Sequence, residues 1–100
     1  MNGKLRNEQL DNLFEAVLQL KTVEECYMFF EDLCTISELR AIEQRFHVAR
    51  MLHDGTVYSE IAAETGASSA TISRVNRCLN YGSDGYRTVF ERLEEKENGV

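Results

Sequence analysis

The stretch SEIAAETGASSATISRVNRCL, residues 59–79, decides the fold of this 100-residue chain. Its pattern predicts one helix from Ser59 to Thr65 and a second that starts near Ser68 or Ser69 and runs to about Leu79. Ser59 is expected to cap the first helix and Ser68 or Ser69 the second, because a serine oxygen accepts a hydrogen bond from the first N–H groups of a helix. Two short helices joined by so tight a turn are typical of a helix-turn-helix.

The apolar and small residues of this stretch fit that motif position by position. We expect Ile61 and Ile72 to connect the two helices, with Val75 on the same buried side. Ala62 is expected at the crossing, where a larger side chain would push the helices apart. Gly66 suits the positive φ that closes the turn, because glycine has no side chain to clash there.

The exposed side chains of the second helix have the chemistry that DNA recognition needs. Small groups at its start would let the helix enter the major groove, and the polar groups that follow can bond to base edges or phosphates. The N-terminus of the helix adds a partial positive charge toward the backbone of DNA. The candidate DNA-binding residues are Ser68, Ser69, Ala70, Thr71, Ser73, Arg74, Asn76 and Arg77.

The overall charge is unfavourable for DNA binding, but its distribution along the chain is favourable. There are 17 acidic and 11 basic residues, a net charge of −6. Between Thr65 and Ser83, however, the chain has two arginines and no acid. A locally positive face on an acidic protein can bind phosphates. The alternative is a protein-interaction module that presents the same helix pair to a protein partner, and the acid-free arginine face favours DNA.

Other classes of protein find little support in the sequence. It shows no nucleophile–base pair, metal-ligand constellation or glycine-rich phosphate loop, so we expect no enzyme activity, cofactor or metal. The chain has no CxxC spacing, so its three cysteines are expected to be free thiols: Cys26, Cys34 and Cys78. No apolar run could span a membrane and the N-terminus is polar, so a cytoplasmic protein without membrane contact is expected.

Apolar periodicity predicts four further helices, about six in all, and therefore an all-α fold in a single domain over residues 1–100. Their expected ranges are about Asn7 to Leu20, Val23 to Leu33, a third from Thr35 to near Asp54-Gly55, and a last helix that carries Tyr86, Val89, Phe90 and Leu93. Thr22 with Glu25, and Thr35 with Glu38, have the spacing of capping boxes. Residues 81–85 are predicted to form a loop, and about 94–100 a fraying charged tail.

The first two predicted helices carry more apolar and aromatic surface than so short a chain can cover. The side chains of the second helix, among them Tyr27, Phe29 and Phe30, point in nearly every direction. Exposed apolar patches of that size usually mark an interface. We therefore expect a helical homodimer.

The chain resembles the Trp-repressor superfamily and, within it, the YerC/YecD-type branch. The segments that carry the resemblance are TISELRAIEQRFHVARMLHDG, SEIAAETGA and SATISRVNRCL. It implies an intertwined dimer from which the helix-turn-helix projects as a head, and a sequence-specific DNA-binding regulator, expected to be a repressor. By position, the DNA-facing residues of the family fall on Ser69, Ala70, Thr71, Ser73 and Arg74.

The resemblance also implies a candidate effector pocket, formed by Arg45, Arg74, Val75 and Cys78. In the tryptophan-binding member of the family, two arginines hold the corepressor, and both of those positions are arginine here. That member has a glycine where this chain has Val75, and a serine where it has Cys78. The rigid valine would crowd an indole ring, and a thiol is a weak hydrogen-bond acceptor. We therefore expect a different small-molecule effector, or none.

Overall fold

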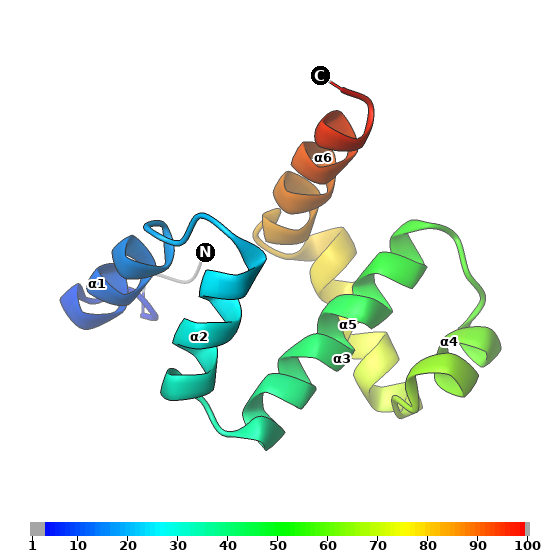
Figure 1. Ribbon diagram of the computed structural model, residues 1–100. Helices are drawn as coiled ribbons and strands as arrows, with labels where there is room; N and C mark the ends of the chain where they lie inside the picture. The colour runs from blue at the N-terminus through cyan, green and yellow to red at the C-terminus, as the bar shows by residue number, and fades with distance from the viewer. Residues whose placement is uncertain (1–3, 100) are drawn as a thin grey trace. The chain divides into compact units, whose positions relative to one another are not determined.

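The computed structural model describes residues 4–99, and that part of the chain contains six α-helices and no strand (Figure 1). The helices are α1 (Glu8–Val17), α2 (Val23–Leu33), α3 (Ile36–His53), α4 (Tyr58–Thr65), α5 (Ser69–Tyr81) and α6 (Gly85–Glu97). The predicted all-α fold class is confirmed. The chain divides into two compact units, unit 1 up to Arg40 and unit 2 from Ala41 onward, so the boundary falls inside α3. None of the helices within residues 4–99 is long and apolar enough to cross a membrane.

Four predicted helix boundaries are wrong. α1 ends at Val17 rather than Leu20, because the backbone N–H groups of Gln19 and Leu20 bond three residues back and tighten the chain into a turn. α5 continues to Tyr81, and α6 already begins at Gly85, so the predicted loop shrinks to residues 82–84.

The fourth boundary is the start of α4, where the predicted cap is wrong. Ser59 does not cap this helix, because the helix starts at Tyr58 and Ser59 lies within its first turn. The N-cap is Val57, whose backbone is extended and whose side chain has no oxygen to offer. The prediction depended on the serine pattern alone, and here the backbone turns into the helix before the serine is reached.

The predicted N-caps at Thr22 and Thr35 are confirmed, but Glu25 Oε1 accepts from the Lys21 N–H and not from the Thr22 N–H, so the first predicted capping box is not completed. The Glu25 N–H donates to Thr22 Oγ1 at 3.0 Å, and the Glu38 N–H donates to Thr35 Oγ1 at 3.1 Å. The Thr35 N–H in turn donates to Glu38 Oε1 at 2.8 Å, which completes a capping box. Hydrogen bonds from the Thr35 backbone and side chain lower the pKa of Glu38 below its ordinary value of 4.5.

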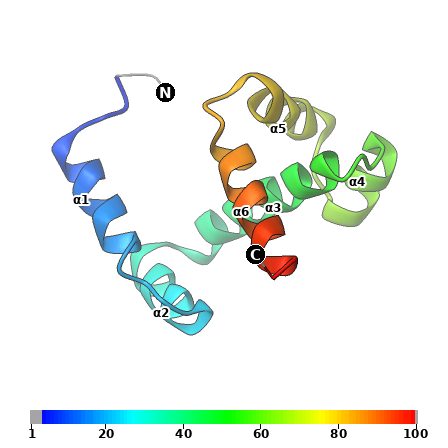
Figure 2. The same ribbon diagram turned by 90° about the horizontal axis from the view of Figure 1, so that it is seen from above.

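Unit 2 contains the hydrophobic core. Its buried residues are Val48, Ala49, Ile61, Ala67, Ile72, Val75 and Phe90, drawn from α3, α4, α5, α6 and the turn of the helix-turn-helix. α6 lies across α3 (Figure 2), where the rings of Phe46 and Phe90 are 5.6 Å apart between centroids. This core gives α4 and α5 a common support, so the helix-turn-helix is part of unit 2.

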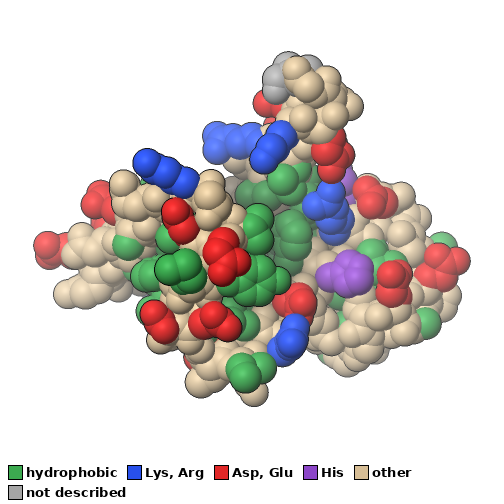
Figure 3. Space-filling model, viewed as in Figure 1, with side chains coloured by type: hydrophobic (Ala, Val, Ile, Leu, Met, Phe, Trp, Pro, Cys, Tyr) green, Lys and Arg blue, Asp and Glu red, His purple; other side chains and the backbone are tan. Residues whose placement is uncertain are grey.

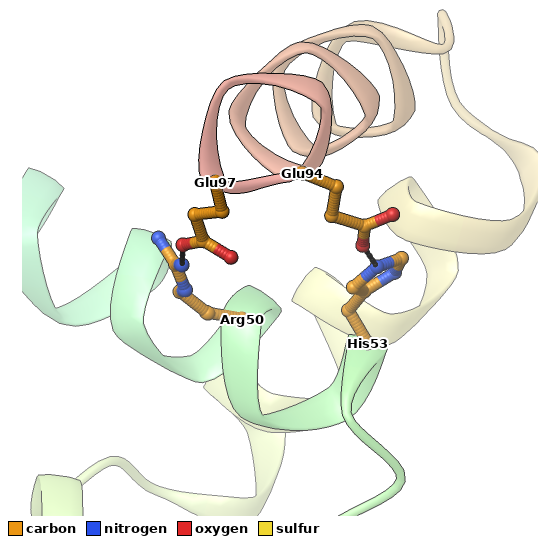
Figure 4. Close-up of polar contacts among 4 residues, drawn as sticks. All are labelled: Arg50, His53, Glu94 and Glu97. Atoms are coloured by element: carbon orange, nitrogen blue, oxygen red, sulfur yellow. Dashed lines mark hydrogen bonds and ion pairs between the residues drawn. The ribbon is translucent and has the colours of Figure 1, made fainter. Parts of the chain in front are cut away.

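The C-terminal end of α6 is also attached to α3. Arg50 Nη2 lies 3.3 Å from Glu97 Oε1, and His53 Nε2 lies 2.7 Å from Glu94 Oε1 (Figure 4). The prediction of a fraying charged tail from about residue 94 is therefore wrong, because α6 stays helical to Glu97 and two of its acids pair with the last turn of α3.

Unit 1 has no comparable core. Within its described residues, 4–40, no side chain is buried, although α1 and α2 are well capped. Leu18, Val23 and Ile36 are 78%, 74% and 77% exposed. Figure 3 shows hydrophobic side chains gathered on the face that carries α2. A helix pair with this much exposed apolar surface is not explained by packing within unit 1.

Candidate nucleic-acid interface

The turn between α4 and α5 is held by hydrogen bonds from two side chains to the backbone. Thr65 Oγ1 donates to the Ile61 carbonyl at 2.7 Å and accepts from the Ala67 N–H at 3.1 Å. Gly66 ends α4 with a φ of 73°, which confirms the predicted positive φ. Gln44 of α3 donates to the Thr65 carbonyl at 3.1 Å, and this bond ties the turn to the rest of unit 2.

Burial of the apolar residues sets the orientation of α5. Ile61 of α4 is fully buried, while Ile72 and Val75 of α5 are 1% and 2% exposed, as the sequence predicted for all three. Leu79 packs at the edge of the same core. Because residues 72, 75 and 79 follow helical spacing, one stripe of α5 faces the core and the remaining faces are turned away from it.

Ser68 caps α5, which decides between the two predicted candidates, Ser68 and Ser69. Its Oγ accepts from the Thr71 N–H at 3.1 Å and donates to Thr71 Oγ1 at 3.0 Å. The Ser68 hydroxyl proton is thus used inside the helix, and its oxygen serves the helix end. Ser68 therefore has a structural role at the start of α5.

The other candidate DNA-binding residues lie along α5 outside the core stripe. Five are exposed and two, Thr71 and Asn76, are partly exposed. The exposed ones are Ser69, Ala70, Ser73, Arg74 and Arg77. α5 has no acidic residue, so the positive charges of Arg74 and Arg77 are not opposed by an acid on their own helix. A surface of this kind can accept phosphates and offers donors to base edges.

Asn80 of α5 is also exposed and was not among the predicted DNA-binding residues. Its Nδ2 lies 3.0 Å from the backbone carbonyl oxygen of Asn76 and 3.0 Å from Asn76 Oδ1. The i, i+4 spacing of two asparagines was the available signal, since side chains at that spacing are neighbours on a helix.

The four candidate effector residues differ in their exposure to solvent. Arg45, Arg74 and Cys78 are exposed, whereas Val75 is buried in the core. Tyr86 of α6, a second residue missed by the sequence analysis, lies within electrostatic reach of both Arg45 and Cys78. Burial raises the pKa of Tyr86, the Cys78 thiol raises it further, and the Arg45 charge acts in the opposite direction. The Tyr86 ring stacks on Phe90, with centroids 5.9 Å apart.

An all-helical chain whose core supports two short helices around a glycine turn, with an acid-free second helix, is a helix-turn-helix protein. Its family is identified by sequence. Residues 8–94 match the family described as Trp repressor protein, and the chain belongs to that family. The family consists of DNA-binding regulators and not of enzymes.

Relatives and solved structures agree with this assignment. YerC of Bacillus subtilis (strain 168) is 57% identical over 94 residues, which cover 94% of this chain and 90% of YerC. A TrpR-like protein from Eubacterium eligens ATCC 27750 is 57% identical, with a TM-score of 0.88 over 93% of this chain and 96% of its own. A candidate Trp repressor from Staphylococcus aureus is 48% identical, with a TM-score of 0.89 over 94% and 95% of the two chains. The predicted resemblance is therefore confirmed.

Proposed function

We propose that this chain is a homodimeric, sequence-specific DNA-binding transcriptional regulator that represses by placing α5 in the major groove. The observation that carries the proposal is the free surface of α5, which exposes Arg74 and Arg77 without any acid on that helix. Family membership supports it, because Trp repressor proteins are DNA-binding regulators.

Within this proposal the residues of α5 have different roles in DNA binding. Ser69, Ala70, Thr71 and Ser73 lie in the first half of the helix, where small side chains allow close approach to the groove. Arg74 is assigned to a base edge, because a guanidinium can bond to guanine with two parallel hydrogen bonds. Arg77 is assigned to phosphate, where it would add affinity without base preference.

The dimer is proposed because unit 1 leaves large apolar side chains exposed. Leu18, Val23 and Ile36 are each at least 74% exposed, and none of residues 4–40 is buried. A second copy of the chain would cover this apolar surface with a surface of the same kind. A two-fold dimer would also present two copies of α5 to half-sites about one helical turn of DNA apart.

Tryptophan is not proposed as the effector. Val75 follows Arg74 in α5 and its side chain is fixed in the core, so the space that a glycine would leave at this position is filled. The charges of Cys78 and Arg45 both act on the pKa of Tyr86, which indicates that the Tyr86 ring lies in the same part of unit 2. A small molecule that uses Arg45, Arg74 and Cys78 would have to fit beside this ring, and an indole is a poor candidate.

Selection of bound duplexes from a random-sequence pool tests the proposal. We expect enrichment of a site with two related halves, and an affinity that falls steeply with salt because phosphate contacts release counterions. Binding that shows no sequence preference and no dependence on salt would contradict it. In that case the helix pair is better explained as a surface for a protein partner.

A further inference from the structure

We propose that Asn80 is a positioning residue that fixes the Asn76 amide so that its NH2 group faces outward, as a hydrogen-bond donor to an acceptor on DNA. The inference rests on the proposed DNA-binding function and adds to it. It says which chemical group α5 presents at one position, and which neighbouring residue decides that choice.

The orientation of both amides follows from one backbone atom. Asn80 lies 3.0 Å from the carbonyl oxygen of Asn76, and a carbonyl oxygen can only accept. The atom of Asn80 that faces this carbonyl is therefore its amide nitrogen. The same nitrogen lies 3.0 Å from the side chain of Asn76, so the atom of Asn76 that faces it is the oxygen Oδ1. Reversing either amide would place two acceptors or two donors against each other.

With Oδ1 occupied, Asn76 is left with its two N–H donors. Within residues 4–99 the Nδ2 atom of Asn76 has no hydrogen-bond partner, so both donors are available to a ligand. In the major groove the matching acceptors are purine N7, guanine O6 and thymine O4, whereas cytosine N4 and adenine N6 are donors and would be rejected. A phosphate oxygen offers the same acceptor chemistry without sequence information.

The positions of Asn76 and Asn80 on α5 support the proposed contact with DNA. Residues 69, 73, 76 and 80 follow the i, i+4, i+7, i+11 spacing that puts side chains on one face of a helix. Asn76 and Asn80 therefore continue the line of Ser69 and Ser73, both exposed, along the side of α5 next to the core stripe. Asn80 is itself exposed, so its replacement should leave the fold intact.

The test is a double-mutant cycle on a selected duplex. Binding of wild type, Asn76→Ala, Asn80→Ala and the double variant is measured on duplexes that carry every single base-pair change. Asn76→Ala should identify the base pair at which wild type prefers an acceptor. At that pair Asn80→Ala should lower the preference about fivefold or more, the scale of a good base contact. The loss should come mainly from better binding of duplexes that place a donor, adenine N6 or cytosine N4, at the position that Asn76 faces, because the freed amide can turn over.

In the double variant, Asn80→Ala should have no further effect, since the group that it positions is gone. If Asn76 donates to phosphate, Asn76→Ala and Asn80→Ala will each weaken all duplexes equally, still without addition in the double variant. The inference is overturned if Asn80→Ala changes neither the base preference nor the overall affinity, if Asn76→Ala changes neither, or if the two effects add. If the wild-type chain selects no DNA sequence at all, that result would instead contradict the proposed function.

Discussion

His53 Nε2 lies 2.7 Å from Glu94 Oε1, across 41 residues of sequence, and the His53 ring packs against Phe90 with centroids 4.8 Å apart. The last turn of α3 is thereby joined to α6 both by a polar contact and by an aromatic one. Arg50 and Glu97 add a second polar contact at 3.3 Å (Figure 4). The acidic end of α6 is therefore a structural part of unit 2.

The two polar contacts should matter much less for stability than the ring beneath them. Glu94→Gln and Glu97→Gln are each expected to lower the free energy of unfolding by about 0–1 kcal/mol, because both pairs are largely exposed to solvent. Phe90→Ala, which removes a side chain only 2% exposed, should cost about 3–5 kcal/mol. Urea unfolding of the three variants measures this order, and a glutamine variant as damaging as Phe90→Ala would contradict it.

The capping box at Glu38 predicts a specific pH dependence. The pKa of Glu38 is lowered in the folded chain, so the ionised form stabilises the fold above the ordinary pKa of 4.5, and this contribution is lost as the pH falls through the lowered value. Wild type should therefore melt at a higher temperature than Glu38→Gln at neutral pH, and the difference should shrink toward zero in acid. Melting curves from neutral to acidic pH test this, with Glu91→Gln as a control for removing one exposed acid.

The proposed parts of the two arginines on α5 differ in a measurable way. Arg77→Ala should weaken binding to all duplexes alike and reduce the slope of log affinity against log salt by about 1. Arg74→Ala should cost about 1–3 kcal/mol on the selected duplex and relax the preference at one base pair. Thr71→Ala and Ser73→Ala should also relax sequence preference. If none of these variants changes binding to a selected duplex, α5 is not the reading helix.

The dimer can be tested through a side chain that has almost no neighbours within one chain. Leu18 is 78% exposed, so Leu18→Asp should be nearly harmless in a monomer. In a dimer that buries Leu18, the same change places a charge in an apolar interface, and dissociation is expected. Sedimentation at micromolar concentration should give twice the chain mass for wild type and less for the variant. Tyr81→Asp, at a residue 87% exposed on unit 2, is the matched control and should leave the dimer intact.

Titration with tryptophan should detect very weak binding or none, and DNA affinity should not depend on it. Overfilling a packed site typically costs about 1–3 kcal/mol, or about ten- to a hundredfold in affinity. Val75→Gly should improve binding of indole-containing ligands if the pocket is otherwise intact. Because Val75 is buried in a helix, this variant will also lose stability, and its melting temperature has to be measured beside its affinity. Calorimetric binding of tryptophan by wild type at low micromolar concentration, with a rise in DNA affinity, would refute the prediction.

Much of the fold could be predicted from the sequence because its signals are local. The caps at Thr22, Thr35 and Ser68, and the left-handed turn at Gly66, depend on residues within one helical turn. The cap of α4 was missed because Ser59 has the right chemistry in the wrong place, one residue inside the helix. Such errors are expected where propensity alone decides between neighbouring start points.

The sequence by itself determined the six helices, the helix-turn-helix and its acid-free second helix, since periodicity, capping and charge are properties of neighbouring residues. Tertiary structure alone decided that Glu94 meets His53 and that the Phe46 ring meets the Phe90 ring. These contacts join residues about 40 positions apart, and they depend on how several helices bury their apolar faces together. No local rule can specify such contacts, because the position of each side chain is set by the packing of the whole core.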